Sequence, residues 1–243
     1  MPKKRKIIPQ VLFPEDLDKI FNVILKRKCR MKYKDYSKFY KVRDIIALYF
    51  MYWAGLRPSE CLNAKANYLN LDKKTFYIPA MSNKQRFEDT IYLPDFIIDK
   101  LYSYLVLRHK LFPNNDWLFP TSHGQSKLGR ISRSTMSRIF RKALRDSGLL
   151  KVSYIDGQNK ERHNFTLYSL RHSYGTIVYA RTRDIRKTAT LLRHRDGMAR
   201  TTLTYIHTTQ SLENKEIIKE VFPQDIFKNI KESKDETQKM RVL

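Results

Sequence analysis

Cysteine and glycine are scarce in this chain, and long apolar runs do not occur. Its two cysteines, Cys29 and Cys61, are too few for a disulfide framework and favour a reducing compartment. No apolar run approaches the ~20 residues that a membrane-spanning helix needs, and no apolar segment follows the N-terminal charges as in a signal peptide. With seven glycines and 42% hydrophobic residues, the composition is that of a helix-leaning globular protein. We therefore expect a cytoplasmic protein without a membrane partner.

Acidic residues are also scarce, and the imbalance indicates a polyanionic partner. The chain has 24 Asp and Glu against 48 Lys and Arg, which gives a formal net charge of +24. Such a charge favours binding to DNA, RNA or an acidic membrane surface over a basic surface without a function. Residues 211–243 contain as many acidic as basic side chains, so the excess lies in residues 1–210. The cluster Lys3–Lys6 resembles a nuclear-import signal, but a basic arm over residues 1–13 of a DNA-associated protein is the favoured interpretation.

Helix signals begin at Pro14. The two acids that follow it suit the positive end of a helix dipole, so we expect an amphipathic helix from this point. Residues 32–40, rich in tyrosine and lysine, are expected to form a connection near the polyanion. Residues 42–53 are apolar nearly all round, which predicts a central buried helix.

The segment after this buried helix places an arginine between two helices. Gly55 supplies a left-handed C-terminal cap, and Pro58 fits the first position of a following helix. Arg57 therefore lies at the junction and is not expected to be a free surface charge. From these residues alone, Arg57 is as readily a structural ion-pair partner of Glu60 as a residue of a functional site.

A small β element is expected next. Residues 69–79 and 90–93 contain β-type side chains on either side of a polar loop, which predicts a hairpin or small sheet. Lys84 lies in that loop and, without further context, is best interpreted as an exposed loop lysine. An amphipathic helix is expected from Pro94 to about Lys110.

A basic helix is predicted from Ser132 to Arg145, capped at its start by Ser132 or Ser134 and ended by Gly148. Its cations are candidates for contact with a DNA groove or the DNA backbone. They are Arg133, Arg138, Arg141, Lys142 and Arg145.

The last third of the chain continues with a turn and two helices. Residues 151–165 contain the turn signal Asp-Gly between short extended segments. Thr166 then caps a helix through Ala180, and residues 185–193 form a second helix that brings His194 to its end. We find no internal repeat or flexible linker that would divide residues 14–210. The predicted fold is therefore one α+β domain, mainly helical, with a small β-sheet.

Three patterns that follow one another along the chain carry a family resemblance. They are Gly55-Leu56-Arg57-Pro58-Ser59-Glu60, Lys84 in its loop, and Leu170-Arg171-His172-Ser173 with Leu192-Arg193-His194 and Tyr205-Ile206-His207. In this order they resemble the catalytic domain of the tyrosine recombinases, the phage integrase and Xer-like family, over roughly residues 12–222. The resemblance implies a mixed α/β catalytic domain that cleaves and rejoins specific DNA sites through a 3′-phosphotyrosine.

The resemblance also assigns roles. Arg57 and Arg171 are similar to the two arginines that hold the phosphate, Lys84 to the hairpin lysine, His194 to the second histidine, and Tyr205 to the nucleophile. Glu60 matches an acidic position that supports the site, while His172 and His207 follow motif residues and are expected to support them.

The chemistry of these side chains agrees with that assignment. A tyrosine hydroxyl has a pKa near ~10, so it becomes a nucleophile only when positive charge and hydrogen bonds stabilise its phenolate. Two guanidinium groups can clamp a phosphate and stabilise the charge of the transition state. Lys84 would protonate the departing 5′ oxygen, and His194 would hydrogen-bond the phosphate or assist proton movement. Because the phosphotyrosine conserves bond energy, we expect neither ATP nor metal nor another cofactor; no P-loop and no carboxylate cluster for two metals is present in the sequence.

Three departures from the family pattern stand out. The position three residues before Arg171, usually His or Lys, is Tyr168, a weak base and a rival nucleophile that its place in the motif disfavours. His194 and Tyr205 lie about two residues further apart than is usual. The helical core-binding domain that normally precedes the catalytic domain is not seen, so the chain is expected to be either a fragment or a minimal recombinase.

The neutral tail, residues 211–243, contains an apolar stripe that ends near Pro223. The resemblance implies a tail that docks on a neighbouring protomer in a synaptic tetramer on DNA; packing within the chain is an equal alternative. Two other functions stay open. One is a catalytically weak DNA-binding accessory or regulatory protein on the same scaffold, and the other is a type IB topoisomerase, which would not need an exchange tail.

Overall fold

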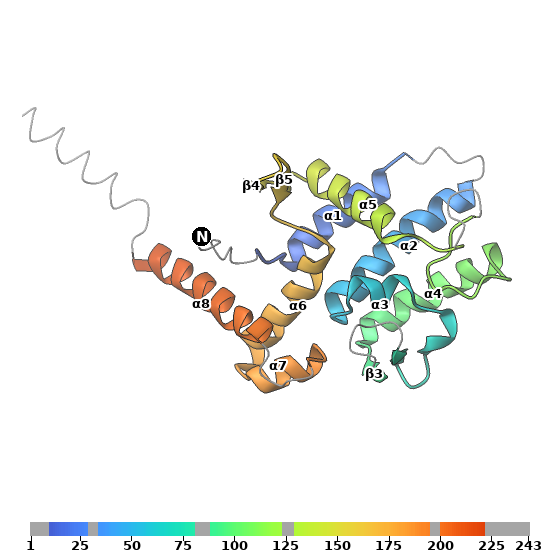
Figure 1. The fold of residues 1–243 in the computed structure, drawn as a ribbon. Helices are drawn as coiled ribbons and strands as arrows, with labels where there is room; N and C mark the ends of the chain where they lie inside the picture. Colours follow the sequence, from blue (N-terminus) through green and yellow to red (C-terminus); the bar gives the residue numbers. More distant parts are fainter. Residues whose placement is uncertain (1–9, 29–33, 81–87, 123–128, 195–199, 222–243) are drawn as a thin grey trace, which may run out of the picture.

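The fold is a helical body with two small antiparallel sheets and one long helix that extends away from it (Figure 1). The computed structural model describes residues 10–28, 34–80, 88–122, 129–194 and 200–221. Its helices in chain order are α1 (Pro14–Lys26), α2 (Lys34–Trp53), α3 (Pro58–Leu62), the short 3₁₀ helix η1 (Ala66–Tyr68), α4 (Asp95–Leu111), α5 (Arg133–Asp146), α6 (Leu167–Thr182), α7 (Ile185–Leu191) and α8 (Arg200–Val221). The predicted mainly helical α+β class is confirmed, and none of the described helices is long and apolar enough to cross a membrane.

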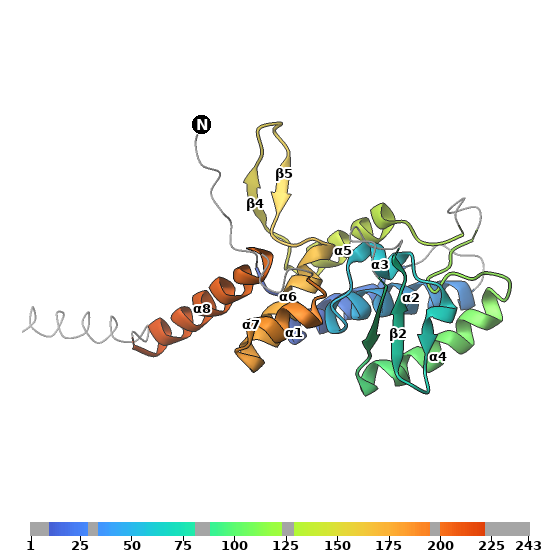
Figure 2. The same cartoon turned by 60° about the horizontal axis from the view of Figure 1, so that its bottom comes forward.

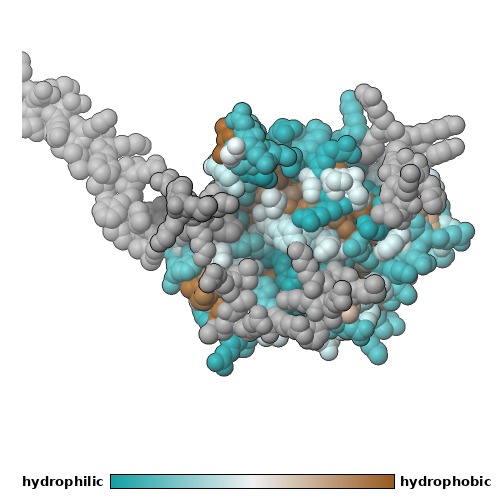
Figure 3. All heavy atoms as spheres, viewed as in Figure 1, coloured by the Kyte–Doolittle hydropathy of each residue, from teal (hydrophilic) through white to brown (hydrophobic). Residues whose placement is uncertain are grey.

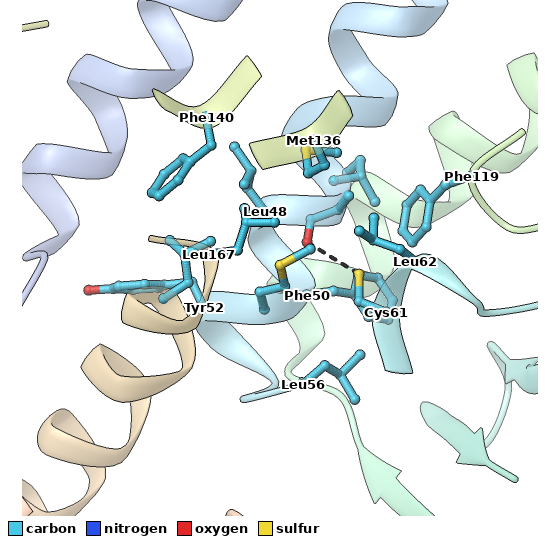
Figure 4. Packing of buried hydrophobic residues seen from close by; sticks show 14 of the residues in the cluster. Leu48, Phe50, Tyr52, Leu56, Cys61, Leu62, Phe119, Met136, Phe140 and Leu167 are labelled. Carbon is cyan, nitrogen blue, oxygen red and sulfur yellow. Dashed lines mark hydrogen bonds between the residues drawn. The ribbon is translucent and has the colours of Figure 1, made fainter. Parts of the chain in front are cut away.

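Helix α2 is the centre of the hydrophobic core. Helices α1, α3, α4 and α6 all pack against it, and no side chain from residue 42 to residue 53 is exposed. Figure 4 shows Phe50 and Tyr52 of α2 surrounded by apolar side chains of other segments, such as Phe119 and Phe140. Because neighbours cover α2 on all sides, this stretch needs no polar face, as its apolar pattern predicted.

The prediction that residues 32–40 form a connection is wrong, because α2 already begins at Lys34. Phe39 and Tyr40 in this segment are buried, and the ring of Phe39 stacks on that of Tyr104 in α4 with 5.6 Å between centroids. Lys34 and Lys38 are exposed. Residues 34–40 therefore form amphipathic helix, and burial of their aromatic side chains decides a conformation that the composition left open.

The junction between α2 and α3 has the predicted geometry. Gly55 has a φ of +59° and ends α2, with the N–H of Leu56 donating to the carbonyl of Phe50 at 3.4 Å. A Cβ on Gly55 would lie 2.5 Å from the ring of Tyr174 in α6, so the glycine also permits close packing. Arg57 is the N-cap of α3, and Pro58 occupies its first turn.

The predicted hairpin around residue 84 is part of a three-stranded antiparallel sheet, visible at the lower right of Figure 2. Strand β2 (Thr75–Ile78) pairs with both β1 (Leu69–Asn70) and β3 (Asp89–Tyr92), with Phe76 opposite Ile91. The loop that contains Lys84 lies outside the described residues. The predicted turn at Asp156 joins a second pair, β4 (Val152–Ile155) and β5 (Glu161–His163), which projects from the body in Figure 2.

Both ends of the described chain contact α6. The predicted arm over residues 1–13 is described only from residue 10, and there Leu12 is buried, its N–H donating to Ser173 Oγ at 2.9 Å and its carbonyl accepting from the Tyr52 hydroxyl at 2.9 Å. At the other end, α8 packs on α6 and α7 and then leaves the body (Figure 1). The boundary predicted at residue 210 falls within α8, which continues without interruption to Val221.

Candidate active site

Arg57 and Glu60 form an ion pair at the start of α3. Arg57 Nη1 donates to Glu60 Oε1 at 2.6 Å, and the backbone N–H of Arg57 donates to Glu60 Oε2 at 2.8 Å. The carboxylate of Glu60 is fully buried, whereas the side chain of Arg57 keeps 21% of its surface exposed. The two interpretations that the sequence left open for Arg57 are therefore compatible, because the side chain in the ion pair remains partly exposed.

Arg171 reaches the same carboxylate from α6. Its buried guanidinium donates from Nη1 to the carbonyl of Gly55 at 2.6 Å and from Nη2 to the carbonyl of Leu192. Arg171 Nη1 also lies 3.9 Å from Glu60 Oε2. Two arginines from opposite halves of the chain thus meet at one glutamate, and backbone carbonyls at the ends of α2 and α7 fix the orientation of the second arginine.

A third arginine, Arg193, completes the group, and the sequence analysis did not assign it to the site. Its Nη2 donates to Glu60 Oε2 at 2.7 Å, and only 9% of its side chain is exposed. The signal that could have found it is a charged residue in the tight turn after α7, directly before His194. We call Arg57, Glu60, Arg171 and Arg193 the arginine cluster.

The arginine cluster concentrates positive charge. Burial alone would raise the pKa of Glu60, but Arg193, Arg171 and Arg57 together lower it, so the carboxylate stays ionised. Burial, and then Arg193 and Arg57, lower the pKa of Arg171 to about 9, at which the guanidinium is still protonated near neutral pH. Three guanidinium groups and one carboxylate give the cluster a net charge of +2. Such an arrangement favours an anion with the charge of a phosphate in its transition state.

Tyr205 on α8 is buried beside this cluster. Its ring lies against His172 with 5.0 Å between centroids, and a Cβ on Gly175 of α6 would come within 2.7 Å of its Cζ atom. Gly175 thus makes room for the tyrosine ring. Burial raises the pKa of Tyr205, while Arg171 and Arg57 oppose that shift. The hydroxyl is therefore protonated at neutral pH, next to cations that would stabilise its phenolate once the proton leaves.

His194 follows Arg193 at the end of α7. Its backbone N–H donates to the carbonyl of Ala189 at 2.9 Å. Burial lowers the pKa of His194 to about 4, and the charges of Arg171, Arg57 and Arg193 add to this effect. The imidazole is consequently neutral near pH 7, with one nitrogen able to donate and the other able to accept a hydrogen bond.

The structure does not place Tyr168, His207 or Lys84 beside these residues. Tyr168 is exposed, and its ring lies under the guanidinium of Arg133, with 5.3 Å from Cζ to the ring centroid. His207 is exposed on α8, and Lys84 lies outside the described residues. Of the two candidate nucleophiles, the buried Tyr205 is thus the one that lies close to Arg57 and Arg171.

Helix α5 carries a separate group of cations. Its apolar face, including Met136 and Phe140, packs toward α1, and Ser132 caps it by accepting from the N–H of Thr135 at 3.1 Å. All five predicted DNA contacts are exposed, and we call them the α5 basic face: Arg133, Arg138, Arg141, Lys142 and Arg145. The molecular surface in Figure 3 is mainly hydrophilic, with small apolar areas between the polar ones.

Within the part of the chain that the structure describes, no group of three or more His, Cys, Asp or Glu side chains is arranged to hold a metal ion. The structure brings three arginines, a neutral histidine and a buried tyrosine to one place. These are the components that nucleophilic attack of a phenol on a phosphodiester requires.

Comparisons with known proteins give a consistent result. The model of the phage integrase family matches residues 14–211. Among curated proteins, the tyrosine recombinase XerA of Pyrococcus furiosus is 29% identical over 193 residues, which are 79% of this chain and 56% of the relative. The chain therefore spans little more than half the length of this relative.

Solved structures show the same fold. The XerH site-specific recombinase bound to a palindromic difH substrate, in a post-cleavage complex, superposes with a TM-score of 0.64 at 22% identity, over 90% of this chain and 56% of that one. A lambda integrase dimer bound to a COC′ core site superposes with a TM-score of 0.55 at 16% identity, over 83% of this chain and 49% of that one.

Proposed function

Because the chain belongs to the phage integrase family, we propose that it cleaves and rejoins DNA strands at specific sites through a covalent 3′-phosphotyrosine bond. The observation that carries the proposal is the position of Tyr205. Its hydroxyl is buried next to Arg57 and Arg171, whose charges lower its pKa against the effect of burial. A structural tyrosine would not need two such cations.

In the proposed reaction, the arginines hold the non-bridging oxygens of the scissile phosphate. The Tyr205 hydroxyl loses its proton as its oxygen bonds to phosphorus, and the bond from phosphorus to the 5′ oxygen breaks. The 5′ oxygen takes up a proton, a role for which the family resemblance proposes Lys84. One proton leaves and one is taken up, and a phosphodiester bond is exchanged for a phosphotyrosine bond, so the step is reversible and consumes no ATP.

His194 assists this reaction as a neutral imidazole. With a pKa of about 4 it does not add to the charge of the free site, and it can hydrogen-bond a phosphate oxygen. A bound phosphate would offset the arginine charges that depress this pKa, so His194 becomes a stronger base once DNA is bound. Binding of the substrate thus raises the pKa of His194.

Double-stranded DNA is the proposed partner, and the α5 basic face supports it. The matched XerH and lambda integrase structures are bound to a difH substrate and to a COC′ core site, and the five exposed cations of α5 suit contact with a DNA backbone. We also propose that copies of the chain assemble on DNA as a synaptic tetramer through the tail over residues 211–243. The supporting observation is that α8 leaves the body and extends past residue 211 (Figure 2).

A covalent adduct tests the proposal. A DNA site would first be selected from a random duplex library with the full chain, and a suicide substrate with a nick beside the cleavage position would then trap the intermediate. We expect a protein–DNA adduct with wild type and none with Tyr205→Phe, which keeps the ring and its packing. An adduct that persists in Tyr205→Phe and disappears in Tyr168→Phe would refute the nucleophile assignment. Tight binding without any adduct would favour the DNA-binding accessory protein instead.

A further inference from the structure

The arginine cluster contains one member, Arg193, whose role the proposed reaction does not explain. We propose that Arg193 is a positioning residue that binds Glu60 and thereby leaves the guanidinium of Arg171 available to the scissile phosphate. This inference rests on the proposed function and adds a residue to its machinery.

The three arginines compete for one carboxylate, and the distances show how it is shared. Glu60 Oε1 accepts from Arg57 Nη1 at 2.6 Å, while Oε2 accepts from Arg193 Nη2 at 2.7 Å and from the backbone N–H of Arg57 at 2.8 Å. Arg171 Nη1 is 3.9 Å from Oε2, beyond a hydrogen bond. Because Arg193 occupies Oε2, Arg171 stays close to the carboxylate without being bound by it.

Without Arg193, Glu60 Oε2 would lose one of its hydrogen-bond donors. Glu60 is buried, so its charge needs compensation, and Arg171 is the remaining guanidinium within reach. A closer bond from Arg171 to Glu60 would turn its donors away from an incoming phosphate. Arg193 also supplies one of the two positive charges that Glu60 leaves uncompensated, so its loss would weaken phosphate binding in the transition state as well.

The backbone at Arg193 supports a role for its side chain. Arg193 has a φ of +54°, in the left-handed region that favours glycine. The turn is closed by the N–H of Arg193 donating to the carbonyl of Thr190 at 2.8 Å, and the carbonyl of Arg193 accepts from Arg57 Nη2 at 3.5 Å. A glycine would fit this conformation without strain, so replacing Arg193 by glycine removes the guanidinium and leaves the backbone geometry undisturbed.

A second acidic residue provides a matched control. Asp89 at the start of β3 lies 3.8 Å from Arg193 Nε and is 41% exposed, whereas Glu60 is fully buried. Nε makes no hydrogen bond to any residue that the structure describes. The contact with Asp89 is therefore only electrostatic and partly screened, and Asp89→Asn should have little effect if Arg193 acts through Glu60.

The experiment compares Arg193→Gly and Arg193→Lys with wild type in single-turnover adduct formation at saturating DNA. We expect Arg193→Gly to slow adduct formation roughly 100-fold while its Kd for DNA changes by less than about 10-fold, and we expect Arg193→Lys to restore part of the rate. In a Glu60→Gln background, the same Arg193→Gly change should slow adduct formation less than about 3-fold, because the carboxylate that Arg193 binds in wild type is absent.

A second measurement does not depend on catalysis. The pKa of Glu60, followed by NMR of carboxyl-labelled glutamate, should be higher in Arg193→Gly than in wild type and unchanged in Asp89→Asn. Wild-type adduct rates in Arg193→Gly, an equal loss in both Glu60 backgrounds, or an unchanged Glu60 pKa would each overturn the inference. If wild type forms no adduct, the proposed function fails, and the Glu60 titration still decides whether Arg193 holds this carboxylate.

Discussion

The arginine cluster and the α5 basic face use the same side chains in opposite surroundings. Arg171 is buried and the side chain of Arg193 is only 9% exposed, and terminal guanidinium nitrogens of both donate to backbone carbonyl or carboxylate oxygens. The cations of the α5 basic face are exposed; Lys142 pairs with Asp146 at 2.8 Å and Arg133 lies over Tyr168. One region fixes guanidinium groups in space, and the other displays them to solvent.

This difference separates two parts of phosphate recognition. Buried, hydrogen-bonded guanidinium groups act over short distances in a low dielectric, so their geometry affects the transition state. Exposed cations attract a polyanion over a range that salt screens, so they affect affinity and not the chemical step. The same type of substitution should therefore change the rate of adduct formation much more in the arginine cluster than on the α5 basic face.

The largest difference is expected for an arginine-to-lysine change. Arg171→Lys keeps the charge but loses the planar fork that binds Gly55 and Leu192. We expect roughly a 10³-fold slower adduct formation, measured with the suicide substrate at saturating DNA. Arg138→Lys on α5 is the matched control and should stay within about twofold of wild type, since a solvated cation tolerates either side chain. An equal decrease in the rate of adduct formation in Arg171→Lys and Arg138→Lys would show that the two regions do not differ in this way.

A smaller effect should follow from neutralising the α5 basic face. In the double variant Arg138→Gln, Arg141→Gln we expect about a tenfold loss of DNA affinity at low salt and a slope of log K against log salt that is shallower by about 1.8. Fluorescence anisotropy over a salt series measures both, and adduct formation at saturating DNA should stay near the wild-type rate. An unchanged salt slope would mean that these two arginines do not contact the DNA backbone.

The smallest effect concerns pH. The pKa of His194 is lowered from 6.5 to about 4 in the folded protein. The unfolded chain therefore binds the proton first as pH falls, so the free energy of unfolding decreases between pH 6.5 and 4. His194 is half-buried, so we expect a loss of only about 1 kcal/mol from this group after allowing for solvent screening.

Urea unfolding of wild type and His194→Gln at pH 7.5 and pH 4.5 tests this prediction. The difference in stability between the two proteins should shift by about 1 kcal/mol in favour of the variant at the lower pH. A difference that is the same at both pH values would show that burial and the arginine cluster do not lower the pKa of His194 in the folded protein.

Local signals predicted those parts of the molecule that depend on a few neighbouring residues. The Gly55 turn, the Pro58 helix start and the Ser132 cap each depend on hydrogen bonds between residues at most six positions apart. The start of α2 was predicted wrongly, because burial of Phe39 against Tyr104 decides it, and Tyr104 belongs to another helix. Arg193 was missed for a similar reason, since its partner Glu60 is 133 positions away.

The sequence by itself determined the charge, the helix boundaries at turns and caps, and the motif residues that indicate the family. Only the tertiary structure decided which of these side chains meet. The docking of α6 on α2 brings Arg171 to the carbonyl of Gly55, 116 positions away, and the packing of α8 on α6 buries Tyr205 while Tyr168 stays exposed. Such contacts depend on how whole helices pack, because burial and hydrogen bonding between distant segments exist only in the folded chain.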